Sequence, residues 1–543
     1  MLHGIPLALL SIVVVLEASE VYESKDTDAS TSFQQRLLRF RLDEYTSQRP
    51  IVHTNQGMVM GIRDGSLNVF RGIPFAAPPT KHLRWRPPQP ASPWSGVLDA
   101  ANFSSRCLDG FGHGDEDCLF LNVFAPAVGE SLPCLLWVHG GGYETGSAND
   151  FDARELVRFY VDSGQPAVVI TTNYRLNVFG FLGSAALRDR DEITGSTGNY
   201  GIQDQRAAFR WVRDNIGGFG GDHRRVMIFG ESAGAGSMTN HLSMPRSAGL
   251  FSSVAIQSGT FASWVAQPLA YSEKVYEQVL DHTGCKDTDC LERLPAASLI
   301  DAVVNIPVGR CCGRMFGKPW IPWAPTVDGV ELTAHPWQLL RKGMLNRVPV
   351  LHGTNMDEGA SFAQLSRNVS VGEYMRLFIS LYEPVLGRDN AMAGAKLYLE
   401  KETHPDVSRI THAWWAGERA ETDQFFCVLR ERIFGTPIDP RLRCISVLLY
   451  TCHGCHPNSC GLPRRGDSIC IHEFGNGDCR RGKTGAPSRG VLVQTRGIRQ
   501  SEREQHVDAE YELARVQAWG TALLTARCGK RRRHQRSLRF RPP

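Results

Sequence analysis

The stretch VMIFGESAGAGSMTNHL, residues 226–242, places a single serine between two glycines, where an apolar strand-like run gives way to a helix-like run. Gly230 and Gly234 permit a tight turn from strand to helix, and such a turn lifts the Ser232 hydroxyl out of the chain. Taken alone, this pentapeptide is also compatible with a glycine-rich turn whose serine caps a helix. The flanking strand and helix favour the first interpretation, an exposed and reactive serine at a strand-to-helix corner.

The sequence on either side of this corner alternates short apolar runs with helical periodicity. Apolar, β-rich runs occur at 133–138, 166–172, 224–230, 251–257 and 348–354, and residues 200–216 have apolar side chains at helical spacing. Strands that alternate with helices predict a mostly parallel sheet with helices on both faces. We therefore expect an α/β fold in which residues 45–440 form one domain.

A serine hydroxyl is a weak nucleophile whose attack creates an oxyanion, so it needs hydrogen-bond donors and a base. The run HGGGY, residues 139–143, closes an earlier apolar strand, and its glycines allow N–H groups to approach a developing negative charge. Glu358, in the run DEG after another apolar strand, supplies an acid 126 residues beyond Ser232. The alternatives are an ordinary glycine turn and an acidic surface turn.

Ten motifs, including the three described above, occur in an order and spacing that belong to a known family. They are FRGIPFAAPP, PWSGVLDA, EDCLFLNVFAP, HGGGY, NYRLNVFGFL, GNYGIQDQRAAFRWVRDNIGGFGGD, FGESAG, AIQSG, PTVDG and DEG. Over residues 50–365 the chain resembles the type-B carboxylesterases and lipases, α/β-hydrolases that include the cholinesterases and the neuroligins. The resemblance implies an α/β-hydrolase fold and esterase chemistry without a metal or organic cofactor.

The resemblance also assigns roles to individual residues. It implies that Ser232 is the nucleophile, that Glu358 is the acid, and that the backbone N–H groups of Gly141, Gly142 and Ala233 hold the oxyanion. Glu231 and Ser258 match positions that buttress the site, and Cys107–Cys118 and Cys285–Cys290 match the first two disulfides of the family.

The first disulfide loop departs from the cholinesterase pattern. In cholinesterases this loop is long and carries a tryptophan that stacks on choline, whereas here it holds only LDGFGHGDED between Cys107 and Cys118. Choline specificity is therefore not expected. So short a loop also makes a poor lid, which favours soluble esters over triglyceride at an interface.

The catalytic histidine is the residue that the resemblance assigns least directly. The family places it in an H-G-x-E turn about 105 to 115 residues after the acid, where this chain has LPRRGDSICIHEFGNG. One alignment puts Arg465 at the histidine position, and arginine cannot act as a base. A shifted alignment puts His472 there, 114 residues after Glu358, and we assign His472 as the base. His453 lies only 95 residues after the acid, and the alternative is that no competent histidine exists.

The composition changes near residue 440. From Arg441 to Pro543 the chain has 20 basic and 8 acidic residues, and 18 of the basic residues are arginine. We expect residues 441–528 to be a divergent part of the domain and residues 529–543 a disordered basic tail. Matches in this region to haem, phosphate-loop and zinc patterns lack the context those sites need. A shifted reading frame or a retained intron is one hypothesis for so abrupt a change.

The amino terminus is typical of a secreted protein. Residues 5–16 are apolar and small residues follow at Ala18 and Ser19, so residues 1–19 are predicted to be a signal peptide. No later segment is long and apolar enough to cross a membrane. The triplets that begin at Asn102 and Asn368 match the N-glycosylation pattern.

Two functions remain open from the sequence. The first is a secreted serine hydrolase that cleaves small-molecule carboxylic esters through an acyl-enzyme, with no nucleic-acid partner. The second is a catalytically inactive, cholinesterase-like binding or adhesion protein that lacks the histidine. The oligomeric state does not follow from the sequence.

Overall fold

The computed structural model describes residues 49–304, 314–315, 318–319, 323–355, 358–361 and 368–401, and three strands at 444–451, 468–474 and 491–494. Contacts divide the chain into two units, Met1–Pro50 and Ile51–Pro543, and every element described below belongs to the second. The predicted signal peptide and the predicted basic tail lie outside the described residues.

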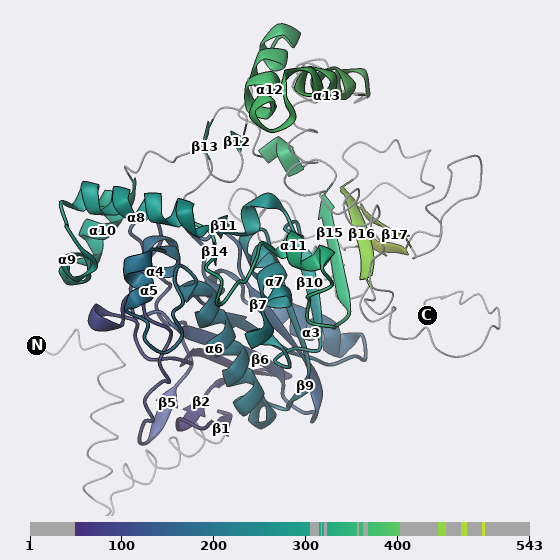
Figure 1. Ribbon diagram of the computed structural model, residues 1–543. Coiled ribbons are helices and arrows are strands. Elements are labelled where there is room, and N and C mark those ends of the chain that lie inside the picture. Colours follow the sequence, from purple (N-terminus) through teal and green to yellow (C-terminus); the bar gives the residue numbers. More distant parts are fainter. Residues whose placement is uncertain are drawn as a thin grey trace, which may run out of the picture. The chain divides into compact units, whose positions relative to one another are not determined.

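An eleven-stranded sheet forms the framework of this unit (Figure 1). Its spatial order is β18-β17-β16-β15-β10-β9-β7-β8-β6-β4-β3. The strands are β3 (Ile62–Asp64), β4 (Leu67–Pro74), β6 (Phe120–Pro126), β7 (Leu132–Val138), β8 (Val168–Thr172), β9 (Gly221–Glu231), β10 (Ser253–Gln257), β15 (Val350–Asn355), β16 (Cys444–Thr451), β17 (Ser468–Phe474) and β18 (Val491–Gln494).

The centre of the sheet is parallel and both edges are antiparallel. Strands β8, β7, β9, β10, β15 and β16 pair in parallel in that order, whereas β3, β4 and β6 on one side and β17 and β18 on the other pair antiparallel. All five residues of β8 are buried, as expected for a strand covered on both faces. The predicted α/β fold with a mostly parallel sheet is confirmed, with antiparallel additions at its edges.

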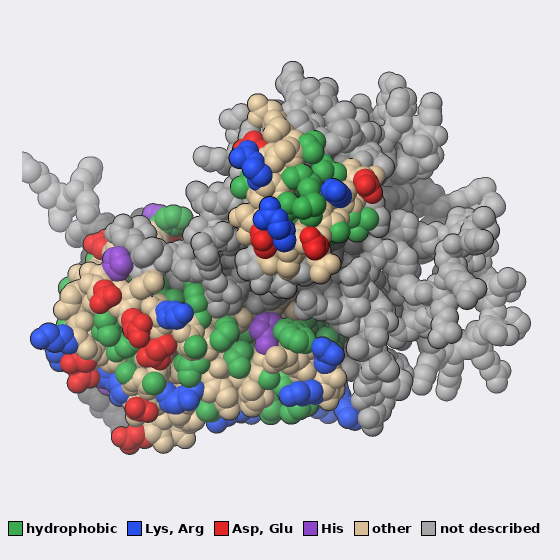
Figure 2. All heavy atoms as spheres, turned by 45° about the horizontal axis from the view of Figure 1, so that its top comes forward, with side chains coloured by type: hydrophobic (Ala, Val, Ile, Leu, Met, Phe, Trp, Pro, Cys, Tyr) green, Lys and Arg blue, Asp and Glu red, His purple; other side chains and the backbone are tan. Residues whose placement is uncertain are grey.

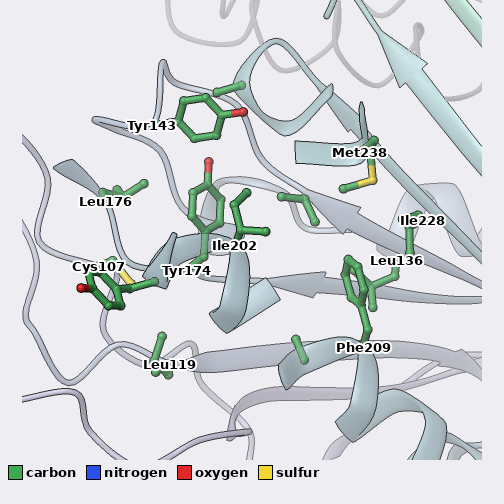
Figure 3. Close-up of a cluster of buried hydrophobic side chains, with 14 of the residues drawn as sticks. Cys107, Leu119, Leu136, Tyr143, Tyr174, Leu176, Ile202, Phe209, Ile228 and Met238 are labelled. Atoms are coloured by element: carbon green, nitrogen blue, oxygen red, sulfur yellow. The ribbon is translucent and has the colours of Figure 1, made fainter. Parts of the chain in front are cut away.

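Successive residues of a strand point to opposite faces of the sheet, so each face carries apolar side chains. Helices cover both faces and complete two apolar cores. On one face the larger core unites Leu136 of β7 and Ile228 of β9 with Phe209 of α6 (Tyr200–Asn215) and Met238 of α7 (Ala233–Ser243) (Figure 3). On the other face α3 (Arg154–Asp162) packs on a second cluster. That cluster consists of Leu67, Val69, Phe124, Ala153, Leu156, Val157, Tyr160, Ala167 and Val169.

The remaining described elements lie outside this sheet. A three-stranded sheet contains β1 (Ile51–His53), β2 (Met58–Met60) and β5 (Val97–Asp99), and short pairs join β11 (Gln267–Pro268) to β14 (Thr326–Val327) and β12 (Arg314–Met315) to β13 (Lys318–Pro319). The other helices are α4 (Asn177–Phe181), α5 (Ala185–Asp189), α8 (Leu269–Thr283), α9 (Thr288–Arg293), α10 (Ala296–Val304), α11 (Pro336–Arg341), α12 (Val371–Leu386) and α13 (Arg388–Lys401), and the short 3-10 turns are η2 (Lys81–Leu83), η3 (Ala148–Asp150), η4 (Ile216–Phe219), η5 (Pro245–Ser247), η6 (Ser263–Val265) and η7 (Glu358–Ser361). Within the described residues, every helix is too short or too polar to cross a membrane.

Charged side chains are mixed at the surface, whereas some of those in the interior form close ion pairs. On the face shown in Figure 2, the described acidic and basic side chains are interspersed. In the interior, the Arg175 guanidinium donates two hydrogen bonds of 2.7 Å to the carboxylate of Asp204 in α6, which also accepts the backbone N–H of Arg175. Their side chains are 3% and 0% exposed. Removing one partner of such a pair leaves the other charge buried without compensation.

Asp204→Ala is therefore expected to lower the free energy of unfolding by about 3–5 kcal/mol. The matched control is Asp214→Ala, because Asp214 pairs with Arg213 at the surface, where the side chains are 39% and 47% exposed. An exposed pair contributes less than about 1 kcal/mol. Chemical denaturation followed by tryptophan fluorescence measures both, and equal losses in the two variants would contradict the expectation.

Candidate active site

Ser232 lies at the corner between β9 and α7. Its backbone has φ 53° and ψ −120°, in a region that residues with a side chain rarely adopt. The neighbouring glycines have no room for a side chain, because a Cβ on Gly230 would lie 2.7 Å, and one on Gly234 2.1 Å, from the carbonyl oxygen of Val138 in β7. The predicted strand-to-helix corner is therefore present, and close packing against the adjacent strand explains both glycines.

Hydrogen bonds hold this strained corner in place. The Ser232 N–H donates to the carbonyl oxygen of Gln257 at the end of β10 (2.9 Å), and the Ser232 carbonyl accepts from Gly236 N–H in α7 (2.9 Å). Gly259 packs from the other side, where a Cβ would lie 2.8 Å from the Ser232 carbonyl oxygen. A backbone in this conformation costs about 1–3 kcal/mol, so its surroundings must supply that energy.

The glycine turn of residues 139–143 lies directly against the serine. A Cβ on Gly140 would lie 3.1 Å from the Cβ of Ser232 and 2.8 Å from the Glu231 carbonyl oxygen. Gly141 and Gly142 have φ of 100° and 65°, which other residues rarely adopt. The structure therefore brings the turn with its two predicted oxyanion donors to Ser232, the predicted nucleophile.

The third predicted oxyanion donor lies at the first position of α7. Ala233 directly follows Ser232, and the N–H groups of a helix's first turn have no partner within the helix. Such N–H groups, together with the positive end of the helix dipole, favour an anion beside the Ser232 hydroxyl.

His139 supports the glycine turn from beneath. It is buried, its Nδ1 lies 2.9 Å from the Gly140 carbonyl oxygen, and its ring stacks on Tyr174 at 4.5 Å. Tyr174 in turn donates its hydroxyl to the His139 carbonyl oxygen (3.0 Å). Burial lowers the pKa of His139 to about 4, so its imidazole is neutral at pH 7. Nδ1 therefore carries the proton, because the carbonyl can only accept.

Glu358 begins the 3-10 turn η7, which follows β15. Its Oε1 accepts the backbone N–H of Asn355 (2.7 Å) and a short hydrogen bond from the Ser258 hydroxyl. Ser258 follows β10, has φ 59°, and donates its N–H to the Gly353 carbonyl oxygen of β15 (2.8 Å). Ser258 thus holds the acid between two adjacent strand ends.

The register of the sheet brings these groups to one edge. Gln257 at the end of β10 pairs with Glu231 at the end of β9 on one side and with Gly353 of β15 on the other. Because the strands are parallel, the residues that follow their carboxyl ends meet at the same edge. Ser232 and Glu358 therefore emerge from strands separated only by β10.

His472 lies within strand β17, where its backbone pairs with Leu448 of β16, which pairs with Thr354 of β15. Two strand spacings, about 10 Å, therefore separate its backbone from β15. The side chain of His472 is outside the described part of the structure, as are His453 and Arg465. The assignment of the base stays a prediction.

Asn177 is a supporting residue that the sequence analysis did not single out. It has φ 43°, its N–H donates to the Tyr143 carbonyl oxygen (2.7 Å), and its side-chain amide donates to the Leu108 carbonyl oxygen (2.9 Å). It therefore ties the glycine turn to the first disulfide loop. Asparagine is enriched in the left-handed region, but only the fold shows which asparagine adopts it.

The two predicted disulfides are present. Cys107 pairs with Cys118, and Cys285 pairs with Cys290. The first loop contacts the chain just after the glycine turn, where Gly110 N–H donates to the Glu144 carbonyl oxygen (3.0 Å). Among the described residues, no group of three or more His, Cys, Asp or Glu side chains could hold a metal ion.

Comparison with known proteins agrees with this geometry. The profile described as the carboxylesterase family matches residues 48–393. The chain is 38% identical to a fumonisin B1 esterase of Sphingopyxis macrogoltabida over 59% of this chain and 58% of that protein. It is 36% identical to a cocaine esterase of Oryctolagus cuniculus (58% and 59%) and 32% identical to an acetylcholinesterase of Leptinotarsa decemlineata (66% and 61%).

A solved carboxylesterase structure is also similar to this chain. The carboxylesterase EST55 of Geobacillus stearothermophilus superposes with a TM-score of 0.60 and 30% identity, over 73% of this chain and 78% of that one. The chain spans less than two thirds of the length of the three curated relatives named above. The family match nevertheless covers more than half of this chain, and the chain therefore belongs to the carboxylesterase family.

Proposed function

We propose that this chain is a secreted serine hydrolase that cleaves small-molecule carboxylic esters through an acyl-enzyme. The observation that carries the proposal is the strained Ser232 corner packed against the glycine turn, with Glu358 held two strands away. A binding protein has no need of a serine held in a costly backbone conformation. The names of the related esterases support ester substrates for this chain.

The proposed reaction proceeds in two steps. In the first, the Ser232 oxygen attacks the ester carbonyl while His472 takes its proton, and the N–H groups of Gly141, Gly142 and Ala233 stabilise the oxyanion. The carbon–oxygen bond to the alcohol then breaks, and the alcohol leaves with that proton. In the second, water attacks the acyl-enzyme by the same route, which frees the acid and restores the serine.

A second candidate, an inactive binding or adhesion protein, is favoured by one observation. His472 has its backbone inside β17 rather than in a turn that follows a strand. A base within a strand reaches the serine only if its side chain points to the edge where Ser232 lies. Activity measurements separate the two candidates.

Ser232→Ala is expected to lower kcat for p-nitrophenyl butyrate by at least about 10³-fold, because the acyl-enzyme can no longer form. The fold should be unchanged, since alanine differs from serine only by the hydroxyl, and thermal denaturation checks this. Equal and negligible turnover by the wild-type protein and the variant, both folded, would support the binding protein instead.

His472→Ala is expected to lower kcat by a similar factor, about 10³-fold, because the serine loses its base. The matched control is His453→Ala, which should leave kcat within about twofold of the wild type. Loss of activity in the control and not in His472→Ala would transfer the role of base to His453.

Secretion and glycosylation belong to the same proposal. The two disulfides favour an oxidising compartment, and the side chains of Asn102 and Asn368 are exposed. In the second triplet, residues 368–370, Val369 is only 2% exposed and the Ser370 hydroxyl accepts the Glu373 N–H at the start of α12. The folded protein therefore presents this triplet less openly than its exposed asparagine suggests.

Asn102→Gln is accordingly expected to remove one glycan from the protein secreted by eukaryotic cells. Gel mobility before and after treatment with peptide-N-glycosidase F measures this, and Asn68→Gln, which lies in no such triplet, is the control. Protein retained in the cytosol, or the same mobility for wild type and Asn102→Gln, would contradict the expectation.

A further inference from the structure

A chain of hydrogen bonds runs behind the nucleophile between α6 and α7. The side-chain amide of Gln205 donates to the hydroxyl of Ser237 (3.0 Å), and its oxygen lies 3.0 Å from Nε2 of His241. Nδ1 of His241 lies 2.9 Å from the hydroxyl of Ser247, which ends the 3-10 turn η5. All four side chains are completely buried.

The end of this chain at Ala233 determines its direction, and the end at Arg206 is consistent with it. At one end the Arg206 guanidinium, which can only donate, gives its Nε–H to the Ser247 oxygen (3.1 Å). At the other end the Ala233 carbonyl, which can only accept, receives the Ser237 hydroxyl (3.0 Å). Because Ser237 gives its only proton to Ala233, its oxygen must accept from the Gln205 amide, and the Gln205 oxygen must then accept from Nε2–H of His241.

His241 therefore carries a proton on Nε2, and in a neutral ring its Nδ1 accepts from the Ser247 hydroxyl. Burial, and secondarily the nearby Arg206, hold the pKa of His241 well below its ordinary value. Its ring also packs against Phe209 of α6 at 4.6 Å, and Figure 3 shows Phe209 beside Leu136 in the hydrophobic core. A neutral imidazole both accepts and donates, which the middle link of the chain requires.

The far end of the chain is firmly held. Arg206 donates to the Glu331 carboxylate (2.5 Å), which also accepts from Arg246 (2.8 Å) and from the Gln203 amide (3.3 Å). The side chains of Arg206 and Glu331 are 4% and 2% exposed. The guanidinium is thus a fixed positive charge, and hydrogen bonds that begin at such a charge are polarised along the chain.

The near end of the chain acts on the first turn of α7. The Ala233 carbonyl that receives the Ser237 hydroxyl belongs to the residue whose N–H is the expected oxyanion donor. The next residue, Gly234, packs closely against Val138, where an added Cβ would lie 2.1 Å from the carbonyl oxygen. The position of this turn therefore depends on the Ser237 hydroxyl behind it and on the strand in front of it.

We propose that His241 is a positioning residue for the ester hydrolysis proposed above, acting through Gln205 and Ser237 to hold the first turn of α7 and its oxyanion donor. This inference rests on the proposed function. His241 does not contact the substrate in this proposal, and it does not act as the base. It contributes to the rate by fixing where the Ala233 N–H points.

A matched pair of serines tests the near end. Ser237→Ala cuts the chain, whereas Ser243→Ala removes an equivalent buried hydroxyl on the same helix, which donates to the Thr239 carbonyl (2.9 Å) outside the chain. Ser237→Ala is expected to lower kcat for p-nitrophenyl butyrate about tenfold with KM within about twofold, and Ser243→Ala to leave kcat within about twofold. Equal losses of kcat in both would overturn the proposal.

Two substitutions of His241 test the middle link. The amide of glutamine reaches the position of Nε2 and can still donate to Gln205, whereas the shorter asparagine reaches only Nδ1 and can still accept from Ser247. Both lose the ring contact with Phe209, so similar falls in melting temperature are expected. His241→Gln should keep kcat within about threefold of wild type, and His241→Asn should lose about tenfold. The opposite order, or equal losses, would overturn the proposal.

A readout without activity separates this inference from the proposed function. Nitrogen-15 NMR of imidazole-labelled protein at pH 7, with the signal assigned by its absence in His241→Gln, should show the Nε2–H tautomer for His241. The Nδ1–H tautomer would overturn the chain even if the wild-type protein is active. Absence of turnover in the wild-type protein, with the Nε2–H tautomer present, would refute the esterase proposal and with it the catalytic role of His241, while leaving the chain itself supported.

Discussion

The contact between Gly234 at the start of α7 and the Val138 carbonyl at the end of β7 is the constraint on which the site depends. A Cβ on Gly234 would lie 2.1 Å from that oxygen, so only glycine allows the helix to approach the strand this closely. The approach brings the start of α7 beside the glycine turn that follows β7. Ser232, the single residue between β9 and α7, has the strained φ of 53°.

The parallel centre of the sheet turns this local constraint into a site. Ser232, Ser258 and Glu358 follow three consecutive strands, and the register places those strand ends level with one another. Ser258 then connects the acid to the sheet through both its hydroxyl and its N–H. The groups that need exact positions are thus attached to strand ends, which are the most rigid backbone available to them.

The buried arginines Arg175 and Arg206 are both paired with a carboxylate, but of these two only Arg206 is also connected to the candidate site. Arg175 and Asp204 neutralise each other inside the core. Arg206 is paired with Glu331 but also begins the hydrogen-bond chain that ends at Ala233. The second arrangement connects a distant charge to α7, the helix that follows Ser232, because each intermediate group both accepts and donates a hydrogen bond.

The amino-acid sequence by itself determined the features that depend on adjacent residues. The corner at Ser232, the glycine turn, the acid after an apolar strand and the α/β order of elements are visible because glycine, β-branched runs and helical spacing are local requirements. The two disulfides and the donor roles came from the resemblance to a family rather than from spacing. The base, predicted to be His472, was the least direct of these assignments, because the sequence after residue 440 loses the family pattern.

Only the tertiary structure decided which distant groups meet. Three sets of partners lie far apart in the sequence: Asn177 and the glycine turn, Arg175 and Asp204, and the hydrogen-bonded side chains between Arg206 and Ala233. In each set the longest hydrogen bond joins residues at least 29 positions apart, and nothing in the neighbouring sequence identifies the partner. The physical reason is burial. A polar group inside the protein must find a partner among whatever side chains packing brings to it, and packing is a property of the whole fold.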